Sequence, residues 1–312
     1  DLYNGLGTTE RIRIRGRLVH DRLTEPHIDT SPMKQISQDE AKRQRFTLWH
    51  QRTKLGQYHT NSEGYFDILI DISHLSLQPG DYTVELRVDN VVAGCNTVTL
   101  LSPDHTGLVI RSDIDLTYLD TDFQSATALA DLMFQTSKDR VALTGMAAVY
   151  KQLHLPTVFL SGSPKFFKRI IEGKMALDGV SNAGIVLKPY KELLVRGLYR
   201  PTSLAPALKE QVGYKLARLL QLRAELPPCT RELLLGDDSE ADHVIYYLYD
   251  QILLQEIPIN ELVKKLKRDG VSRHWRRQIS RAAKLAIRLV ASRKDQTVSP
   301  VAGIFIRKTR VP

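Results

Sequence analysis

The stretch GLVIRSDIDLT, residues 107–117, decides the fold of this chain. It begins with an apolar run, residues 108–110, that is typical of a buried strand. It then places two carboxylates, Asp113 and Asp115, two residues apart. Like charges side by side at the end of a buried strand are costly unless a cation lies close to them. The stretch therefore predicts a buried strand whose carboxyl end meets positive charge.

Three similar apolar runs follow along the chain, and stretches with a helical pattern separate them. The four runs are residues 108–110, 158–160, 185–187 and 233–235. Strands that alternate with helices are typical of a parallel sheet whose crossover helices cover its faces. We therefore expect residues 104–257 to form an α/β domain.

Residues 1–103 have the pattern of β-structure. Ile12 and Ile14 alternate with arginines, which is the period of a half-buried strand. Residues 78–88, QPGDYTVELRV, show the same alternation after a Pro-Gly turn. Short strands separated by turn residues indicate an antiparallel β-sandwich, in which residues 37–50 are expected to add a short helical insertion.

The composition restricts the class of protein. With 42% apolar and 25% charged residues it is that of an ordinary globular protein. No apolar run is long enough to cross a bilayer, and the chain does not open with the pattern of a signal peptide. Its two cysteines, Cys95 and Cys229, suggest neither a disulfide framework nor a CxxC metal motif. We expect a cytoplasmic protein, with peripheral contact at a membrane surface as an open alternative.

Positive charge is concentrated in residues 258–312, which are predicted to form a basic helical C-terminal extension. The segment has 15 Lys and Arg against 3 Asp and Glu, a net charge of +12, so the rest of the chain carries −3. One amphipathic helix has a basic face made of Arg277, Arg281, Lys284 and Arg288. This helix either docks on the domain with its basic face in solvent or contacts an anionic membrane. A nucleic-acid partner is the least favoured alternative, because the helix has no recognisable binding motif.

Polar residues follow three of the four apolar runs. In open α/β sheets the reactive crevice lies beyond the carboxyl ends of the strands, so these residues are expected to converge. They are Asp113, Asp115 and Thr117 after the first run, Ser161 and Gly162 after the second, and Asp237 and Asp242 after the fourth. Lys215, on a predicted helix that leads into the last of these strands, would bring positive charge to them.

These residue types fit metal-assisted phosphoryl transfer. Mg²⁺ prefers hard carboxylate oxygens and keeps several waters, so Asp113 and Asp237 suffice together with a substrate phosphate. One aspartate would attack phosphorus, and the second, Asp115, would protonate the leaving oxygen. Ser161 would hold phosphate oxygens, and Lys215 would offset charge on the transferring group.

The order of these residues resembles the four motifs of the haloacid dehalogenase superfamily. More narrowly, the stretches SDIDLT, FLSGSP and LLLGDDSEAD resemble the catalytic domain of the actin-patch phosphatidate phosphatase family. The stretches RIRIRGRLVHDR and NSEGYFDILI also resemble the β-domain that precedes that domain in bacterial members. The resemblance covers residues 10–255 and implies a Rossmann-like phosphatase domain after a β-sandwich.

What the resemblance implies is a Mg²⁺-dependent phosphatase that converts phosphatidate to diacylglycerol through an aspartyl-phosphate. By motif position, the catalytic residues would be Asp113 as nucleophile, Asp115 as general acid and base, and Lys215. Phosphate would be bound by Ser161, Gly162 and Thr117, and the metal by Asp113, Asp115, Asp237 and Asp242. Leu116 stands where the family has an acidic residue, and Asp238-Ser239 where Ser-Gly is usual, which leaves the substrate less determined than the reaction.

Each motif also has a plainer interpretation. A DxDxT motif after a strand is often a solvated turn, and Ser161 alone would be an ordinary helix N-cap. Lys209 competes with Lys215 for the third motif, but Lys215 has the family's spacing to Asp237. For the whole protein, the alternatives are a phosphatase of a soluble phosphate or phosphoprotein, and a non-catalytic module that binds lipid or phosphate. The complete set of motif residues favours an enzyme over the binding module.

Overall fold

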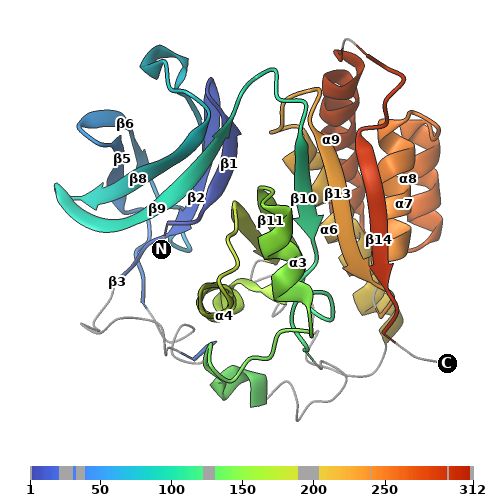
Figure 1. The fold of residues 1–312 in the computed structure, drawn as a ribbon, viewed down its shortest axis with the longest axis horizontal. Coiled ribbons are helices and arrows are strands. Elements are labelled where there is room, and N and C mark those ends of the chain that lie inside the picture. The colour runs from blue at the N-terminus through green and yellow to red at the C-terminus, as the bar shows by residue number, and fades with distance from the viewer. Residues whose placement is uncertain are drawn as a thin grey trace.

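The protein is a mixed α/β structure in which a parallel sheet lies beside curled, mainly antiparallel sheets (Figure 1). The computed structural model describes residues 2–20, 31–32, 39–121, 131–188, 204–239, 241–293 and 295–309. None of its helices, within these residues, is long and apolar enough to span a bilayer.

A five-stranded parallel sheet forms the centre of the second half of the chain. Its strands are β10 (Leu108–Ser112), β11 (Thr157–Pro164), β12 (Gly184–Lys188), β13 (Arg231–Asp237) and β14 (Val301–Arg307). They lie in the order β12-β11-β10-β13-β14, and every neighbouring pair is parallel. The first four contain the four apolar runs, so the predicted parallel sheet is confirmed.

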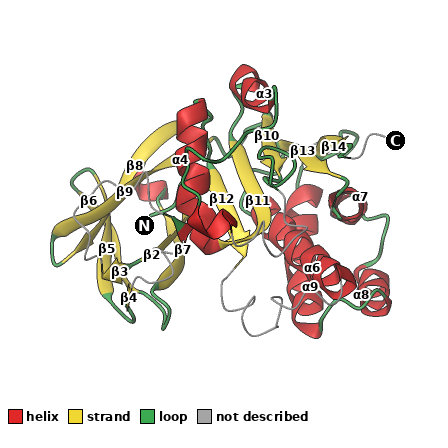
Figure 2. Cartoon of the chain, turned by 90° about the horizontal axis from the view of Figure 1, so that it is seen from below, coloured by secondary structure: helices red, strands yellow, loops and turns green. Residues whose placement is uncertain are grey.

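Helices cover both faces of this sheet (Figure 2). The helices on one face are α3 (Met146–Leu153) and α4 (Lys168–Asp178), and the 3₁₀ helix η3 (Lys165–Phe167) joins β11 to α4. On the other face lie α6 (Leu204–Arg223), α7 (Asp242–Leu253), α8 (Ile259–Arg268) and α9 (Arg273–Ala291). Parallel strands need such crossovers, because a tight hairpin cannot join them.

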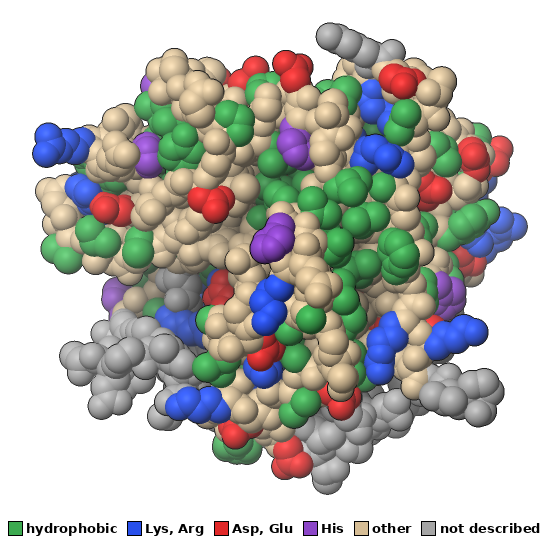
Figure 3. Space-filling model, in the orientation of Figure 1, with side chains coloured by type: hydrophobic (Ala, Val, Ile, Leu, Met, Phe, Trp, Pro, Cys, Tyr) green, Lys and Arg blue, Asp and Glu red, His purple; other side chains and the backbone are tan. Residues whose placement is uncertain are grey.

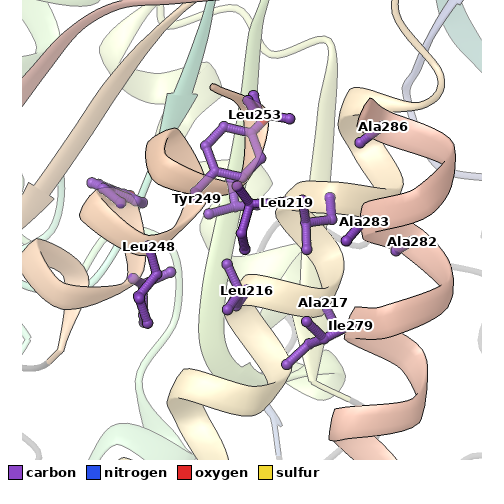
Figure 4. Close-up of a cluster of buried hydrophobic side chains, with 14 of the residues drawn as sticks. Leu216, Ala217, Leu219, Leu248, Tyr249, Leu253, Ile279, Ala282, Ala283 and Ala286 are labelled. Carbon is purple, nitrogen blue, oxygen red and sulfur yellow. The ribbon is translucent and has the colours of Figure 1, made fainter. Parts of the chain in front are cut away.

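The largest core lies among the helices α6, α7 and α9 (Figure 4). Leu219 of α6, Tyr249 of α7 and Ala283 of α9 are all 0% exposed. The approach of α9 to α6 depends on Gly213, where a Cβ would lie 2.8 Å from the Cβ of Trp275. Each large apolar side chain buried here contributes about 1.5–3 kcal/mol.

The C-terminal segment differs in part from its expected helical form. Most apolar residues of α9, among them Trp275 and Ile279, are buried, while Leu285 and the four residues of the basic face are exposed. Residues 301–307 are not helical, however, and form β14 beside β13. Ile304 and Phe305 of this edge strand are 37% and 59% exposed, and apolar side chains gather over the β13–β14 part of the face shown in Figure 3. The prediction of a purely helical extension was therefore wrong.

The first hundred residues form a five-stranded sheet in the order β1-β9-β8-β5-β6 and a two-stranded sheet of β2 with β7. These strands are β1 (Gly5–Thr8), β2 (Arg11–Arg17), β5 (Arg45–His50), β6 (Thr53–His59), β7 (Tyr65–Asp71), β8 (Gly80–Val88) and β9 (Val91–Leu101). The short strands β3 (Val19–His20) and β4 (Asp39–Glu40) pair with each other. Ile12 and Ile14 are buried, as their alternation predicts. Most pairs are antiparallel, but β1 pairs with β9 in parallel.

The helical insertion expected within residues 37–50 does not occur in residues 39–50. A turn there leads from β4 into β5, whose Phe46 and Leu48 are 1% and 0% exposed. Their spacing of two residues places both side chains in the core of a sheet, and this packing overrides the helical propensity of the preceding polar residues. Residues 37 and 38 lie outside the described residues.

Candidate active site

Three predicted carboxylates converge where β10 and β13 end. Asp113 follows β10, and its N–H donates to the carbonyl oxygen of Leu235 at 2.8 Å, which continues the strand pairing by one residue. Asp237 ends β13, and Asp242 begins α7. One oxygen from each of the three carboxylates lies within 4.8 Å of the others. At 1%, 0% and 0% exposure, the three residues form a buried acidic cluster.

Helix α6 brings the expected cation to this cluster. The ammonium nitrogen of Lys215 lies 3.0 Å from Oδ1 of Asp113 and donates a hydrogen bond to Oδ1 of Asp242 at 2.7 Å. Lys215 is itself 1% exposed. Residues 107–117 were predicted to meet positive charge, and this charge comes from a helix about a hundred residues further along the chain.

One ammonium does not balance three carboxylates. The formal charge of the cluster is −2, and burial of like charges in close contact is costly. Oδ2 of Asp242 is also buried and accepts no hydrogen bond from any described residue. Hard carboxylate oxygens in excess of the local positive charge are the donor set that a divalent metal ion prefers. Asp113, Asp237 and Asp242 could therefore bind a metal.

A glycine allows the third carboxylate to reach the strand. A Cβ on Gly236 would lie 2.7 Å from Oδ2 of Asp242 and 2.8 Å from the ring of Tyr246. The Tyr246 hydroxyl donates to the carbonyl oxygen of Leu235 at 2.9 Å. Burial, followed by the negative charges of Asp242 and Asp113, raises the pKa of Tyr246 well above its ordinary value. Tyr246 thus stays a neutral hydrogen-bond donor that supports the strand end.

Asp115 lies apart from the three carboxylates. Its Oδ2 accepts hydrogen bonds from the hydroxyls of Ser161 and Ser163, both at 2.6 Å. The Ser161 hydroxyl in turn accepts from the N–H of Ser163 at 2.9 Å. Oδ1 of Asp115 is buried and receives no hydrogen bond from the described part of the chain. Of the four residues predicted to hold the metal, Asp115 is the one that the geometry does not group with the others.

The remaining predicted residues lie at the edge of the cluster. Thr117 donates a hydrogen bond from Oγ1 to Oδ2 of Asp237 at 3.3 Å, so its hydroxyl faces a carboxylate. Gly162 follows Ser161, and a Cβ there would lie 2.9 Å from Nε2 of Gln211 on α6. The side chain of Lys209, the competitor of Lys215, lies outside the described residues.

Comparison with known proteins supports the recognition made from the motifs. Residues 108–257 match the family model described as phosphatidate phosphatase APP1, catalytic domain. Over this segment the chain is similar to the APP1 catalytic-domain family. The match spans β10 to the end of α7 and so includes every predicted site residue, and the haloacid dehalogenase superfamily is consistent with it.

The other comparisons add little. No curated protein matches the chain. A glycosyl hydrolase family 2 member from Bacteroides cellulosilyticus DSM 14838 is a similar solved structure, with 8% identity and a TM-score of 0.26. The similarity covers 98% of this chain and 44% of that one, so the chain spans less than half of that protein. A likeness this weak has no bearing on fold or activity.

Two residues beyond the APP1 match contact the loops next to the acidic cluster. Arg307, at the end of β14, donates a hydrogen bond to the carbonyl oxygen of Leu116 at 2.9 Å. Thr309 donates to Oδ1 of Asp238 from its N–H at 2.8 Å and from its hydroxyl at 2.6 Å. These bonds lower the pKa of Asp238. The end of β14 is thus hydrogen-bonded to both loops that carry the clustered carboxylates.

The contact from Arg307 holds a residue, Leu116, that has an unusual backbone conformation. Its φ of 55° is in the left-handed region, which a bulky side chain rarely adopts. Its N–H donates to the carbonyl oxygen of Leu119 at 2.8 Å, and the contact with Arg307 holds its carbonyl oxygen. Such backbone strain, of order 1–3 kcal/mol, persists only where surrounding contacts fix it. Sequence reasoning missed Arg307, because nothing in a short motif indicates a partner on a distant strand.

Two further residues of the APP1 segment were not predicted. Arg140 is 5% exposed, and burial lowers its pKa while the negative charge of Asp115 opposes that change. Its guanidinium therefore adds positive charge on the Asp115 side of the site. Tyr150 of α3 shares a 2.6 Å hydrogen bond with the hydroxyl of Ser112, directly before Asp113. Neither residue belongs to a motif, so the isolated sequence gave no signal for them.

Proposed function

We propose that this protein is a Mg²⁺-dependent phosphatase that hydrolyses phosphatidate to diacylglycerol through a phosphorylated Asp113. The single observation that carries the proposal is the buried cluster of Asp113, Asp237 and Asp242 around Lys215, in a segment that matches the APP1 catalytic domain. A strand order that reverses between β10 and β13 is what a Rossmann-like phosphatase domain of the haloacid dehalogenase type would have.

The domain division belongs to the same proposal. Residues 1–103 would form a β-sandwich domain, residues 104–257 the phosphatase domain and residues 258–312 a basic extension. Support for a separate N-terminal unit comes from its own buried cluster, which includes Phe46 and Leu48 and contains no residue after Leu100.

Asp113, Asp237 and Asp242 would hold the Mg²⁺. When bound, the ion would neutralise charge on the phosphoryl oxygens and on the nucleophile. Without it, a phosphate dianion would meet the net negative charge of the cluster. Lys215 contributes the fixed positive charge of the site, because its ammonium contacts Asp113 and Asp242 at once.

The reaction would proceed in two displacements. In the first, a carboxylate oxygen of Asp113 attacks phosphorus, and the bond from phosphorus to the alcohol oxygen breaks. Asp115 gives its proton to the departing oxygen, so diacylglycerol leaves as a neutral alcohol. In the second, Asp115 takes a proton from a water molecule, which attacks phosphorus and releases inorganic phosphate and Asp113.

The hydrogen bonds of Asp115 suit this exchange of a proton. Ser161 and Ser163 hold Oδ2, which fixes the orientation of the carboxyl group, and Oδ1 remains to carry the proton. The hydroxyls of Ser161 and Thr117 and the backbone at Gly162 would bind phosphoryl oxygens once substrate enters. Arg140 would add a further cation beside Asp115.

The test measures phosphate release in the presence of Mg²⁺ from phosphatidate in vesicles and from p-nitrophenyl phosphate. We expect Asp113→Asn to reduce both rates to background and EDTA to abolish them reversibly. Asp120→Asn is the matched control, because Asp120 is exposed and lies on the same loop. Full activity in EDTA, or wild-type turnover by Asp113→Asn, would refute the mechanism. Turnover of the soluble ester with none of phosphatidate would instead favour a soluble phosphate or phosphoprotein as substrate.

The exposed basic face of α9 supports a second part of the proposal, contact with an anionic membrane. Arg277, Arg281, Lys284 and Arg288 are all exposed, while the opposite face of the helix packs against the core. Basic groups near an anionic surface each contribute about 1 kcal/mol of attraction. Such contact would bring the protein to a lipid substrate.

A further inference from the structure

A cavity lies between the N-terminal strands and the APP1 segment. It is distinct from the cluster of carboxylates described above. Its volume is ≈ 420 Å³, within the range of small-molecule sites. On one side it is lined by β2 and β7, and on the other by η3, β12 and α6. None of the three clustered aspartates lines it.

The charged lining of this cavity is mainly positive. It includes four cations, Arg15, Lys165, Lys168 and Arg218, and one carboxylate, Asp67. Two of the cations have partners. Nη2 of Arg15 lies 2.6 Å from Oε1 of Glu225, and its Nε lies 3.5 Å from Oδ2 of Asp67. Lys168 forms an ion pair with Glu172.

The other two cations, Lys165 and Arg218, have no ion-pair partner among the described residues. The ammonium of Lys165 lies 4.0 Å from the centre of the Tyr65 ring. One guanidinium nitrogen of Arg218 donates to the neutral Oε1 of Gln221 at 2.7 Å. Burial and the charge of Arg218 lower the pKa of Lys165 to about 8, although Asp67 and Glu63 oppose the shift. An anion placed between the two cations would relieve this unfavourable environment.

We infer that this cavity is a second anion site, in which Lys165 and Arg218 bind the phosphate group of a phosphomonoester. A guanidinium binds phosphate through two parallel N–H donors, and an ammonium adds a point charge, so the pair suits a dianion. The ring of Tyr65 and the buried ring of Tyr3 line the same cavity and offer apolar surface to the rest of the ligand.

Two continuous segments of the chain, β11 with η3 and helix α6, join this cavity to the acidic cluster. Lys165 comes two residues after Ser163, which holds Asp115, and Arg218 comes three residues after Lys215 on α6. A ligand bound here therefore contacts the elements that position the general acid and the catalytic cation. Binding itself does not depend on the proposed reaction and can be measured without it.

The probe is inorganic phosphate, titrated into the full chain by calorimetry in EDTA, where the acidic cluster repels anions. We expect Lys165→Gln/Arg218→Gln to bind phosphate at least about tenfold more weakly, because each charge-assisted hydrogen bond contributes about one such factor. Lys264→Gln/Arg268→Gln, which removes the same two residue types from the exposed face of α8, should bind like wild type. Equal affinity of the wild type and the cavity variant would overturn the inference.

Two further measurements keep the test decisive. Should circular dichroism show that the double variant is unfolded, the single variants Lys165→Gln and Arg218→Lys replace it, and both must weaken binding. Wild-type affinity should also fall above about pH 8, as Lys165 loses its proton among its charged neighbours Arg15, Arg218, Asp67 and Glu63. Constant affinity from pH 8 to pH 10, where inorganic phosphate is already a dianion, would contradict a role for Lys165.

Competition distinguishes the two sources of the phosphate group. Displacement of the probe by glycerol 3-phosphate but not by phosphatidate in neutral vesicles identifies a soluble phosphate ester. Displacement by the vesicles identifies a lipid head group. Displacement by neither would overturn the assignment of a phosphomonoester. Because no turnover is measured, failure of this inference is distinguishable from failure of the proposed function.

Discussion

Two buried clusters of charged side chains lie along strands β10 and β13, and they differ in how completely their carboxylates are paired. The first is the acidic cluster of Asp113, Asp237 and Asp242 at their carboxyl ends. In the second, Nε of Arg111 lies 2.7 Å from Oε1 of Glu232, and Nε of Arg223 lies 3.8 Å from Oε2, which also accepts a hydrogen bond from Tyr249. All three charged residues of this second cluster are 0–1% exposed.

The difference lies in how fully the carboxylates are satisfied. Both oxygens of Glu232 have partners, and the guanidinium of Arg223 also donates to the carbonyl oxygens of Pro227 and Pro228. In the acidic cluster, Oδ2 of Asp242 accepts nothing from the described residues, and negative charge is in excess. Burial of charge alone therefore does not identify a functional site. What distinguishes the acidic cluster is a buried carboxylate oxygen without a donor among the described residues, together with carboxylates in excess of the nearby cation.

The largest effect that would test this comparison is expected for Asp237→Asn. We expect phosphatase activity to fall by about a thousandfold or more, since a divalent metal supplies several kcal/mol of charge stabilisation. Stability towards urea should not decrease, because the substitution removes one of several like charges. A large loss of stability at this position would show that the acidic cluster is structural after all.

For Glu232→Gln we expect a loss of stability with little change in activity. Breaking a buried ion pair costs about 3–5 kcal/mol of unfolding free energy, because the remaining guanidinium charges lose their partner. The specific activity of the folded fraction should change little. Urea unfolding and phosphate release, measured beside the exposed control Glu261→Gln, separate the two effects. Unchanged stability would mean that the second cluster contributes nothing to the fold.

A smaller effect is expected at the contact between β14 and the catalytic loops. Arg307→Gln should lower kcat by about tenfold, because a small displacement of the Asp113 loop is enough to misalign the nucleophile. KM should change little, and Arg307→Lys should restore part of the rate. Lys308→Gln, the exposed neighbour, is the matched control. If Arg307→Gln kept the wild-type kcat, β14 would have no role in positioning the Asp113 loop.

The smallest effect on turnover is expected for the basic face of α9. Replacing Arg277, Arg281, Lys284 and Arg288 by Gln should weaken co-sedimentation with phosphatidate vesicles at low salt by about tenfold or more. Turnover of p-nitrophenyl phosphate should stay unchanged. A variant that exchanges Arg and Lys at the same four positions preserves the charge and should bind like wild type. If the Gln variant and wild type sedimented equally, the basic face of α9 would contact only solvent and would have no role at a membrane.

The parts of the fold that were predictable are those with local causes. The four apolar runs became β10 to β13 because a strand buried on both faces needs apolar residues throughout. The buried face of α9 followed from helical spacing for the same reason. Asp113, Lys215, Asp237 and Asp242 were found because motif order along the chain carries their identity.

What could not be predicted depends on contacts distant in sequence. The run that forms β14 is interrupted by Gly303, and its place beside β13 is set by a partner strand, not by its own pattern. Asp113 and Asp115 look equivalent as metal ligands in a DxD motif. The backbone after β10 sends the carboxyl group of Asp115 to Ser161 and Ser163 instead. Arg307 and Leu116 are 191 residues apart, beyond the reach of any local pattern.

The fastening of β14 to the catalytic loops also has a consequence for synthesis on the ribosome. Asp113 and its neighbours emerge early, but the strand that holds the Leu116 and Asp238 loops is translated last among the described elements. At about 5–20 residues per second, roughly ten seconds or more separate the two events. A nascent chain would therefore carry all three clustered carboxylates before residue 309 is made, and would still lack the contacts that hold their loops.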